Sequence, residues 1–144
     1  MYSVKVGSSA KELEAILALR YKILRQPWNQ PADTATDNLE GKSINAYIED
    51  TNGNVIACAR LQENENKVGQ VRYMSVDNSY QGKGLGKLLL VFLERKAKDL
   101  NLSKIELQAR ENAVKFYEAN NYVIKEKTFL LWGIIQHYLM EKSL

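Results

Sequence analysis

The chain has 144 residues, which is enough for one folded domain with a core of its own but short for two. Hydrophobic residues make up 45% of it and charged residues 26%, so we expect one globular domain over residues 1–144 and no disordered chain. The net charge is only +3, with the lysines spread among acidic residues. This balance gives no reason to expect a nucleic-acid partner.

Two residue counts exclude further kinds of site. Cys58 is the only cysteine and His137 the only histidine, so the chain has no intramolecular disulfide and too few ligands for a cysteine or multi-histidine metal site. We expect no metal. No apolar run reaches the length that spans a membrane, and the N-terminal residues alternate in polarity. The sequence therefore predicts a cytoplasmic protein without a membrane partner.

The first third of the chain predicts a strand, a helix and a long loop. Residues 2–6 alternate as a strand does, and Ser9 and Glu12 have the spacing of a capping box. The helix that begins there should end near Pro27, with one apolar side made of Leu13, Ile16, Leu17 and Leu24. Two prolines and several Asn, Asp and Gly residues make residues 27–42 irregular, and a loop of that length is often a binding element.

The middle of the chain predicts three consecutive strands and a helix. Residues 44–49 and 55–61 are joined by a turn with an Asn52-Gly53 step, which is a strong hairpin signal, and residues 68–76 add a third strand. A helix over residues 84–100 follows a glycine-rich segment. Its apolar side chains have three-four spacing and are Leu85, Leu88, Leu89, Phe92, Leu93 and Ala97.

The last third predicts a strand over residues 105–109, a short helix over 112–120 and strands over 122–127 and 134–141. Hairpin strands followed by a strand-helix-strand unit indicate an α/β (α+β) fold, in which helices pack on the faces of a mixed sheet.

The chemistry is concentrated in the segment from Gln81 to Lys87, which contains three alternating glycines between a strand end and a helix start. Backbone N–H groups of such a segment can point at an anion, and the helix N-terminus adds partial positive charge. Lys83 and Lys87 add cationic side chains, so the segment predicts a pyrophosphate site. The alternative is that the glycines only shape a tight turn into the helix.

Two other phosphate-binding motifs do not fit this segment. A dinucleotide fingerprint needs a third glycine where Lys87 stands, and it normally follows the first strand of a parallel unit. A Walker loop needs Ser or Thr after its lysine, and Leu88 follows Lys87. The sequence therefore does not predict a nucleotide site of either kind.

The segment Gln81-Gly82-Lys83-Gly84-Leu85-Gly86 resembles the Gln/Arg-x-x-Gly-x-Gly/Ala signature of the GNAT (Gcn5-related N-acetyltransferase) superfamily. A second stretch, with Leu107-Gln108-Ala109-Arg110 and then Phe116-Tyr117, resembles a later motif of that family. The resemblance covers residues 55–142. Arg110 stands where many relatives carry asparagine, but a subset with Ala-Arg there also ends in His-x-x-Met-x-Lys, as His137 to Lys142 do. Asn121 replaces a usual glycine and can adopt the same left-handed backbone.

The resemblance implies an acyl-CoA N-acyltransferase fold, a mixed, mostly antiparallel sheet of six to seven strands flanked by helices, and acetyl-CoA as the co-substrate. It implies that the pantetheine arm lies along the strand before the glycine segment and that Tyr117 donates a proton to the departing CoA thiolate. The residues expected to bind acetyl-CoA on this basis are Met74, Ser75, Val76, Gln81, Gly82, Lys83, Gly84, Leu85, Gly86, Lys87, Asn112 and Tyr117.

Other side chains are candidates for the acceptor side of such a site. His137 is the natural base for the amine proton, with relayed water or a purely structural histidine as alternatives. Arg72 is expected to contact substrate or be solvated, and three acidic residues of the long loop, Asp33, Asp37 and Glu40, are candidates for attracting an amine. Cys58 lies mid-strand between alanines, so we expect a buried structural thiol, and Tyr117 has the alternative of filling a gap beside Phe116.

The sequence and the resemblance together predict an N-acetyltransferase that moves the acetyl group of acetyl-CoA directly to a primary amine of a small molecule, peptide or protein. Two alternatives stay open. One is a non-catalytic module that binds acyl-CoA as a sensor, and the other is an interaction protein that uses the fold as a scaffold. A homodimer is compatible with the sequence, which does not identify the acceptor amine.

Overall fold

The computed structural model describes residues 1–144, beginning with strand β1 (Lys5–Gly7) and helix α1 (Ala10–Arg20). The predicted capping box is confirmed. The Glu12 N–H donates to the Ser9 hydroxyl at 3.1 Å, and the Ser9 N–H donates to the Glu12 carboxylate at 3.0 Å. The two bonds give partners to two backbone N–H groups at the start of α1 that have none within the helix. Strand β1 is shorter than predicted and lies further along the chain.

The chain stays helical beyond α1, but the winding changes. Residues 21–25 form a π-helical turn and residues 26–28 a 3₁₀ turn, which ends at Asn29 in the left-handed conformation with φ 56°. The helix therefore reaches the predicted end near Pro27, although its buried side differs from the predicted one. Ile16, Leu19 and Arg20 are buried, and a wider π turn changes which side chains face the sheet beyond them.

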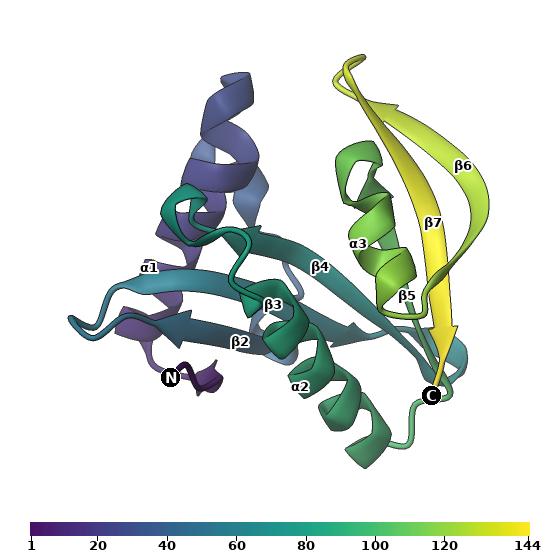
Figure 1. The fold of residues 1–144 in the computed structure, drawn as a ribbon, viewed down its shortest axis with the longest axis horizontal. Helices are drawn as coiled ribbons and strands as arrows, with labels where there is room; N and C mark the ends of the chain where they lie inside the picture. The colour runs from purple at the N-terminus through teal and green to yellow at the C-terminus, as the bar shows by residue number, and fades with distance from the viewer.

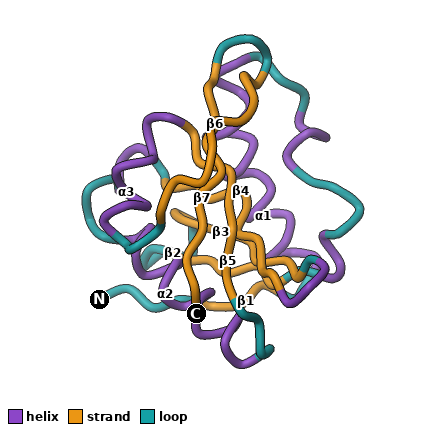
Figure 2. The backbone as a smooth tube through the Cα atoms, turned by 90° about the vertical axis from the view of Figure 1, so that its right-hand side faces the viewer, coloured by secondary structure: helices purple, strands orange, loops and turns teal.

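Seven strands form one sheet in the order β1-β2-β3-β4-β5-β7-β6. The predicted hairpin and third strand are confirmed as β2 (Ile44–Glu49), β3 (Val55–Glu63) and β4 (Val68–Val76). The other strands are β5 (Lys104–Arg110), β6 (Val123–Leu131) and β7 (Ile135–Ser143). Every neighbouring pair is antiparallel except β4 and β5, so the expected mixed, mostly antiparallel sheet is confirmed. Figure 2 shows the strands, in orange, gathered in the middle of the molecule.

Helices cover both faces of the sheet. Helices α2 (Leu85–Asp99) and α3 (Val114–Ala119) lie in front of it in Figure 1, and α1 lies behind. Successive side chains of β2 point to opposite faces of the sheet. Ala46 and Ile48 belong to the core under α2, whereas Tyr47 packs with Ile16 of α1. None of these helices combines the length and the apolar run needed to cross a bilayer.

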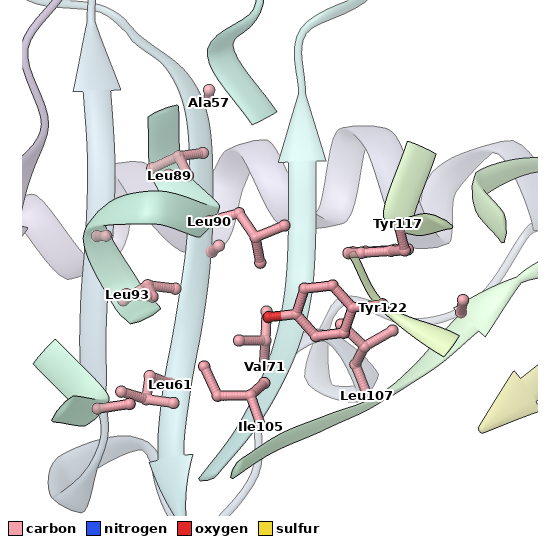
Figure 3. Packing of buried hydrophobic residues seen from close by; sticks show 14 of the residues in the cluster. Ala57, Leu61, Val71, Leu89, Leu90, Leu93, Ile105, Leu107, Tyr117 and Tyr122 are labelled. Carbon is pink, nitrogen blue, oxygen red and sulfur yellow. The ribbon is translucent and has the colours of Figure 1, made fainter. Parts of the chain in front are cut away.

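The main core lies between α2, α3 and the front face of the sheet (Figure 3). Most of the predicted apolar positions of α2 are buried in it, among them Leu85, Leu89 and Leu93. Leu88 was expected on the same side but is 41% exposed, and Leu90 is buried instead. The real contact stripe of α2 is therefore turned slightly from the side that spacing alone suggests.

Strands β4 and β5 pair only at their beginnings. The parallel ladder joins residues 68–70 to residues 104–106 and then stops, and Figure 1 shows the two strands separating beyond that point. The pairing of β4 with β3 shifts register between Cys58 and Arg60, opposite Tyr73, whose φ of 59° is unusual for an aromatic residue. The divergence opens the sheet, and the candidate site lies in the opening.

Candidate active site

A cavity of about 430 Å³ lies between the diverging strands β4 and β5. Its lining comes from elements on both faces of the sheet: Leu24 and Arg25 follow α1 on one face, and Phe116 and Tyr117 belong to α3 on the other. Side chains from both faces of the sheet thus surround the cavity. Four of the predicted site residues line it, namely Arg72, Met74, Tyr117 and His137.

Tyr117 presents a hydroxyl group without a partner to this cavity. Its ring lies edge-on to Phe116 at 4.9 Å and to Tyr122 at 5.8 Å, and the residue is 6% exposed. The hydroxyl makes no hydrogen bond within the protein, yet it is not among the fully enclosed side-chain atoms that lack one. Burial raises the pKa of Tyr117, so the phenol keeps its proton at neutral pH and its O–H group can donate a hydrogen bond in the cavity.

His137 reaches the same cavity from β7 as a neutral imidazole. Nδ1 lies 3.0 Å from the Ile135 carbonyl oxygen, which only accepts, so Nδ1 carries the proton and Nε2 keeps its lone pair. Burial is the main cause that lowers the pKa of His137, and the charges of Arg110 and Arg25 lower it further, against the opposite effect of the Ile135 carbonyl. The ring stacks on Phe129 at 4.4 Å, which fixes its plane.

The edge of β4 that faces β5 has no strand partner beyond Gln70. On its other side, beyond the register shift, Ser75 and Val76 of β4 pair with Cys58 and Ala57 of β3, and Met74 precedes them in the same strand. Their side chains alternate, with Ser75 buried and its neighbours half-buried. Such an edge offers backbone donors and acceptors to an extended ligand, as an added strand would use them.

The glycine-rich segment leads from this edge into α2. Gly82 and Gly84 have φ values of 78° and 79°, and a Cβ atom on either would meet no other atom, so both face open space. Gly84 is the N-cap of α2 and supplies no side-chain acceptor, which leaves N–H groups of the first turn free. This cradle fits an anion such as a pyrophosphate.

The other residues of the segment have different positions. Gly86 is a packing glycine, because its Cβ atom would lie 3.1 Å from Cζ of Phe116. The Gln81 amide donates to the Val76 carbonyl at 3.3 Å, and the Leu85 side chain is buried in the core, so Leu85 offers only its backbone. Lys83 and Lys87 are exposed beside the cradle.

Two of the acidic residues that were candidates for attracting an amine bind arginines instead. Asp37 accepts two hydrogen bonds from Arg60, at 2.8 and 3.0 Å, and one from Arg72 at 2.9 Å. Glu40 accepts two from Arg20, at 2.6 and 3.1 Å. Hydrogen bonds from Arg60 are the main cause that lowers the pKa of Asp37 to about 2. These carboxylates neutralise buried arginines, whereas Asp33 is exposed on the long loop and lines no part of the cavity.

Residues 13–122 match the model of the acetyltransferase (GNAT) family, which covers more than half of the chain. The protein belongs to the GNAT acetyltransferase family. It is therefore an acyltransferase, and the enzymes of its family use acetyl-CoA or CoA. The prediction of the GNAT resemblance is confirmed. The narrower resemblance, to the subset that ends in His-x-x-Met-x-Lys, stays a prediction.

Individual relatives agree with the family. An uncharacterized N-acetyltransferase of Bacillus subtilis, YjcF, is 27% identical over 137 residues, which are 94% of this chain and 96% of that one. A protein of Drosophila melanogaster, provisionally named glucosamine 6-phosphate N-acetyltransferase, is 35% identical over 83 residues, or 53% of this chain and 38% of its own.

Solved structures show the same fold. A provisionally named N-acetyltransferase from Lactobacillus plantarum superposes with a TM-score of 0.88 at 21% identity, covering 99% of this chain and 98% of that one. ElaA of Escherichia coli gives a TM-score of 0.84 at 17% identity, with 99% of both chains covered.

Two further residues considered in the sequence analysis, Asn112 and Cys58, do not line the cavity. Asn112 is exposed on the 3₁₀ turn of residues 111–113, next to Ala113, which does line the cavity. Cys58 is fully buried outside the cavity, and burial raises the pKa of its thiol to about 11, in line with the structural role expected for it. No three His, Cys, Asp or Glu side chains gather as a metal ion would need.

Sequence reasoning missed several residues of the cavity, above all Arg25 and the loop residues beside it. Arg25 and Arg110 both line the cavity, and Trp28 and Trp132 pack against these arginines. The sequence offers only an indirect signal, which does not point to the arginines themselves. Both tryptophans of the chain fall in irregular segments far apart in the sequence, where large aromatic side chains need a common partner to be buried.

Proposed function

We propose that this protein transfers the acetyl group of acetyl-CoA directly to a primary amine, without a covalent enzyme intermediate. The observation that carries the proposal is one cavity with two complementary groups: the partnerless hydroxyl of Tyr117, which can donate a proton, and the neutral imidazole of His137, which can accept one. General acid-base catalysis of acyl transfer needs both.

The β4 edge and the glycine segment fit the co-substrate. The backbone of Met74, Ser75 and Val76 would bind the pantetheine arm along the unpaired edge, and the N–H groups around Gly82 and Gly84 would bind the pyrophosphate. Lys83 and Lys87 would add charge-assisted contacts at the cradle. Gln81 would hold the segment to Val76, with Leu85 and Gly86 placing its backbone, and Asn112 lies on the turn that flanks this side.

The reaction balances within this arrangement. The amine nitrogen forms a bond to the acetyl carbon, the carbon–sulfur bond breaks, and the nitrogen loses one proton while the sulfur gains one. Nε2 of His137 accepts the amine proton, directly or through water, and the Tyr117 hydroxyl donates to the departing sulfur. Cys58 takes no part, because its buried thiol is outside the cavity.

The acceptor would enter from the face of the sheet that α1 covers, since α3 and the glycine segment occupy the opposite face. Arg72 lines the cavity and remains available to an acceptor, because Asp37 binds only its Nη1. The name of the Drosophila relative points to an amino sugar phosphate as one acceptor chemistry in the family, which supports a small amine here.

The test is turnover of acetyl-CoA with a panel of small amines and peptides, read by release of free CoA thiol and by the mass of the acetylated product. We expect acetylated product for at least one class of amine. A protein that binds acetyl-CoA but acetylates none of them would support the alternative of a sensor module.

A further inference from the structure

Arg25 and Arg110 bring two positive charges to the cavity, and backbone carbonyls hold them there. Arg25 donates from Nε to the Thr34 carbonyl and from Nη1 to the Leu24 carbonyl, both at 3.1 Å. Arg110 donates from Nη2 to the same Leu24 carbonyl at 3.1 Å. The two guanidinium groups are therefore fixed around one carbonyl oxygen, and both line the cavity.

Neither of these arginines has a counter-ion. None of the ion pairs of the protein includes Arg25 or Arg110. The other arginines of this region differ, because Arg20, Arg60 and Arg72 are all paired with Asp37 or Glu40. Asp37 and Glu40 of the long loop therefore neutralise other arginines, and the positive charges of Arg25 and Arg110 are not neutralised by any acidic residue.

Aromatic rings, and no carboxylates, pack against the guanidinium groups of Arg25 and Arg110. The guanidinium carbon of Arg110 lies 4.7 Å from the centre of the Trp28 ring, and that of Arg25 lies 5.4 Å from the Trp132 ring. The two indole rings are themselves 6.3 Å apart. An aromatic face stabilises a cation and orients it, but it leaves the net charge in place.

The positive charge of Arg25 acts on the pKa of Arg110. Burial lowers the pKa of Arg110 to about 10, and the charge of Arg25 contributes in the same direction, so both groups repel but stay protonated at neutral pH. Like charges at a half-buried site without a counter-ion cost free energy. An anion in the cavity would remove that cost.

We propose that the acceptor amine carries a second, anionic group, a carboxylate or a phosphate, and that Arg25 and Arg110 bind this group. The inference rests on the proposed function and names its class of substrate. Planar guanidinium groups suit both anions, since each offers two parallel donors. The same charges favour the neutral form of a nearby amine, which is the nucleophilic form, and they disfavour polyamines and lysine side chains.

The co-substrate does not account for this pair of arginines. The glycine segment meets the cavity at Met74 and Phe116, because a Cβ on Gly86 would lie 3.9 Å from the Met74 sulfur and 3.1 Å from Phe116. Arg25 belongs to the opposite face of the sheet, together with Leu24. The phosphates of CoA therefore have their own cradle, apart from Arg25 and Arg110.

The first experiment measures binding without turnover. Trp28 and Trp132 are the only tryptophans, so intrinsic tryptophan fluorescence reports on this site alone. The protein, saturated with CoA, is titrated with matched pairs: glucosamine 6-phosphate and glucosamine for a phosphate, and glutamate and its diamide for carboxylates. We expect the anionic member of at least one pair to bind about tenfold or more tightly, and the pair that responds identifies the anion. Equal or tighter binding of the members that lack the anionic group, or no binding of any anionic member, overturns the proposal.

Variants then assign the effect to these arginines. In Arg25→Gln and Arg110→Gln, binding of the preferred anionic amine should weaken about 10- to 100-fold, the usual loss for a charge-assisted hydrogen bond, while binding of the analogue without the anionic group does not weaken. Arg110→Lys keeps the charge and should retain part of the affinity. Arg95→Gln is the control, because it removes one exposed positive charge of α2 outside the cavity. Unchanged CoA affinity shows that each variant is folded, and unchanged anion affinity in both folded glutamine variants refutes the assignment.

Failure of the inference differs from failure of the proposed function. If the enzyme acetylates amines but prefers uncharged or cationic ones, the inference is wrong and the function stands. If anionic amines bind through Arg25 and Arg110 but no acetylated product forms, the inference stands as a ligand preference and the transfer does not.

Discussion

The Tyr117→Phe variant separates catalysis from packing at the residue proposed to protonate the CoA sulfur. The ring stays, and with it the edge-on contacts to Phe116 and Tyr122. The lost hydroxyl has no hydrogen-bond partner in the protein, so no donor or acceptor is stranded by its removal. We therefore expect the free energy of unfolding to change by less than about 1 kcal/mol.

The effect on the rate should be much larger. General acid catalysis is typically worth about 10² to 10⁴ in rate, and a CoA thiolate is already a fair leaving group, so we expect the lower end. A loss of about 100-fold corresponds to about 2.7 kcal/mol of transition-state stabilisation. The affinity for acetyl-CoA should be nearly unchanged. The assay is single-turnover release of CoA thiol at saturating acetyl-CoA, so that product release does not hide the chemical step.

Tyr122→Phe is the matched control, with the opposite expected pattern. The Tyr122 hydroxyl donates to the Glu94 carboxylate at 2.8 Å inside the core, so its loss should destabilise the fold by about 1.5–3 kcal/mol without slowing the folded enzyme. Full turnover by Tyr117→Phe, under conditions where chemistry limits the rate, would remove Tyr117 from the mechanism and leave water as the proton donor.

Three further predictions concern other parts of the chain. Burial lowers the pKa of His137, so we expect the acidic limb of the wild-type kcat/KM–pH profile below pH 6.5. The His137→Gln variant should lose this limb, and a variant that retains it would show that another group is the base. Gly84→Asp places a carboxylate in the open cradle and should weaken acetyl-CoA binding in calorimetry about 100-fold or more, and wild-type affinity in the folded variant would move the phosphate site elsewhere. Glu40→Gln should lower the free energy of unfolding in urea by about 3–5 kcal/mol, because fully buried Arg20 loses its counter-ion. Although burial raises the pKa of Glu40, hydrogen bonds from Arg20 lower it to about 2. The stabilisation by Glu40 is therefore present above pH 4.5 and is lost as the pH falls through about 2. A Glu40→Gln variant as stable as the wild type at pH 7 would contradict the prediction.

Local patterns were sufficient for most of the fold. The Asn52-Gly53 turn between β2 and β3, the capping box of α1 and the helix indicated by three-four spacing in α2 each depend on neighbouring residues, and all three are confirmed, although Leu88 does not face the core as predicted. The glycine segment was also placed correctly, between a strand end and a helix start. Its open, left-handed glycines are a backbone property that the sequence signals directly.

The long-range geometry of the site could not be predicted from the sequence. The divergence of β4 from β5 depends on packing across the whole sheet, and the left-handed backbone of Tyr73 has no local signal in an aromatic residue. The same holds for Arg25. Its approach to the cavity follows a π-helical turn that sequence spacing does not indicate, and its neighbours Trp28 and Trp132 come together only in the folded chain.

The most direct test of the account is a crystal structure of the protein with CoA bound. The account predicts the pyrophosphate at the N–H groups around Gly82 and Gly84, the pantetheine along β4 from Met74 to Val76, and the sulfur within hydrogen-bonding distance of the Tyr117 hydroxyl. Binding of CoA outside the opening between β4 and β5, or a sulfur remote from both Tyr117 and His137, would contradict it.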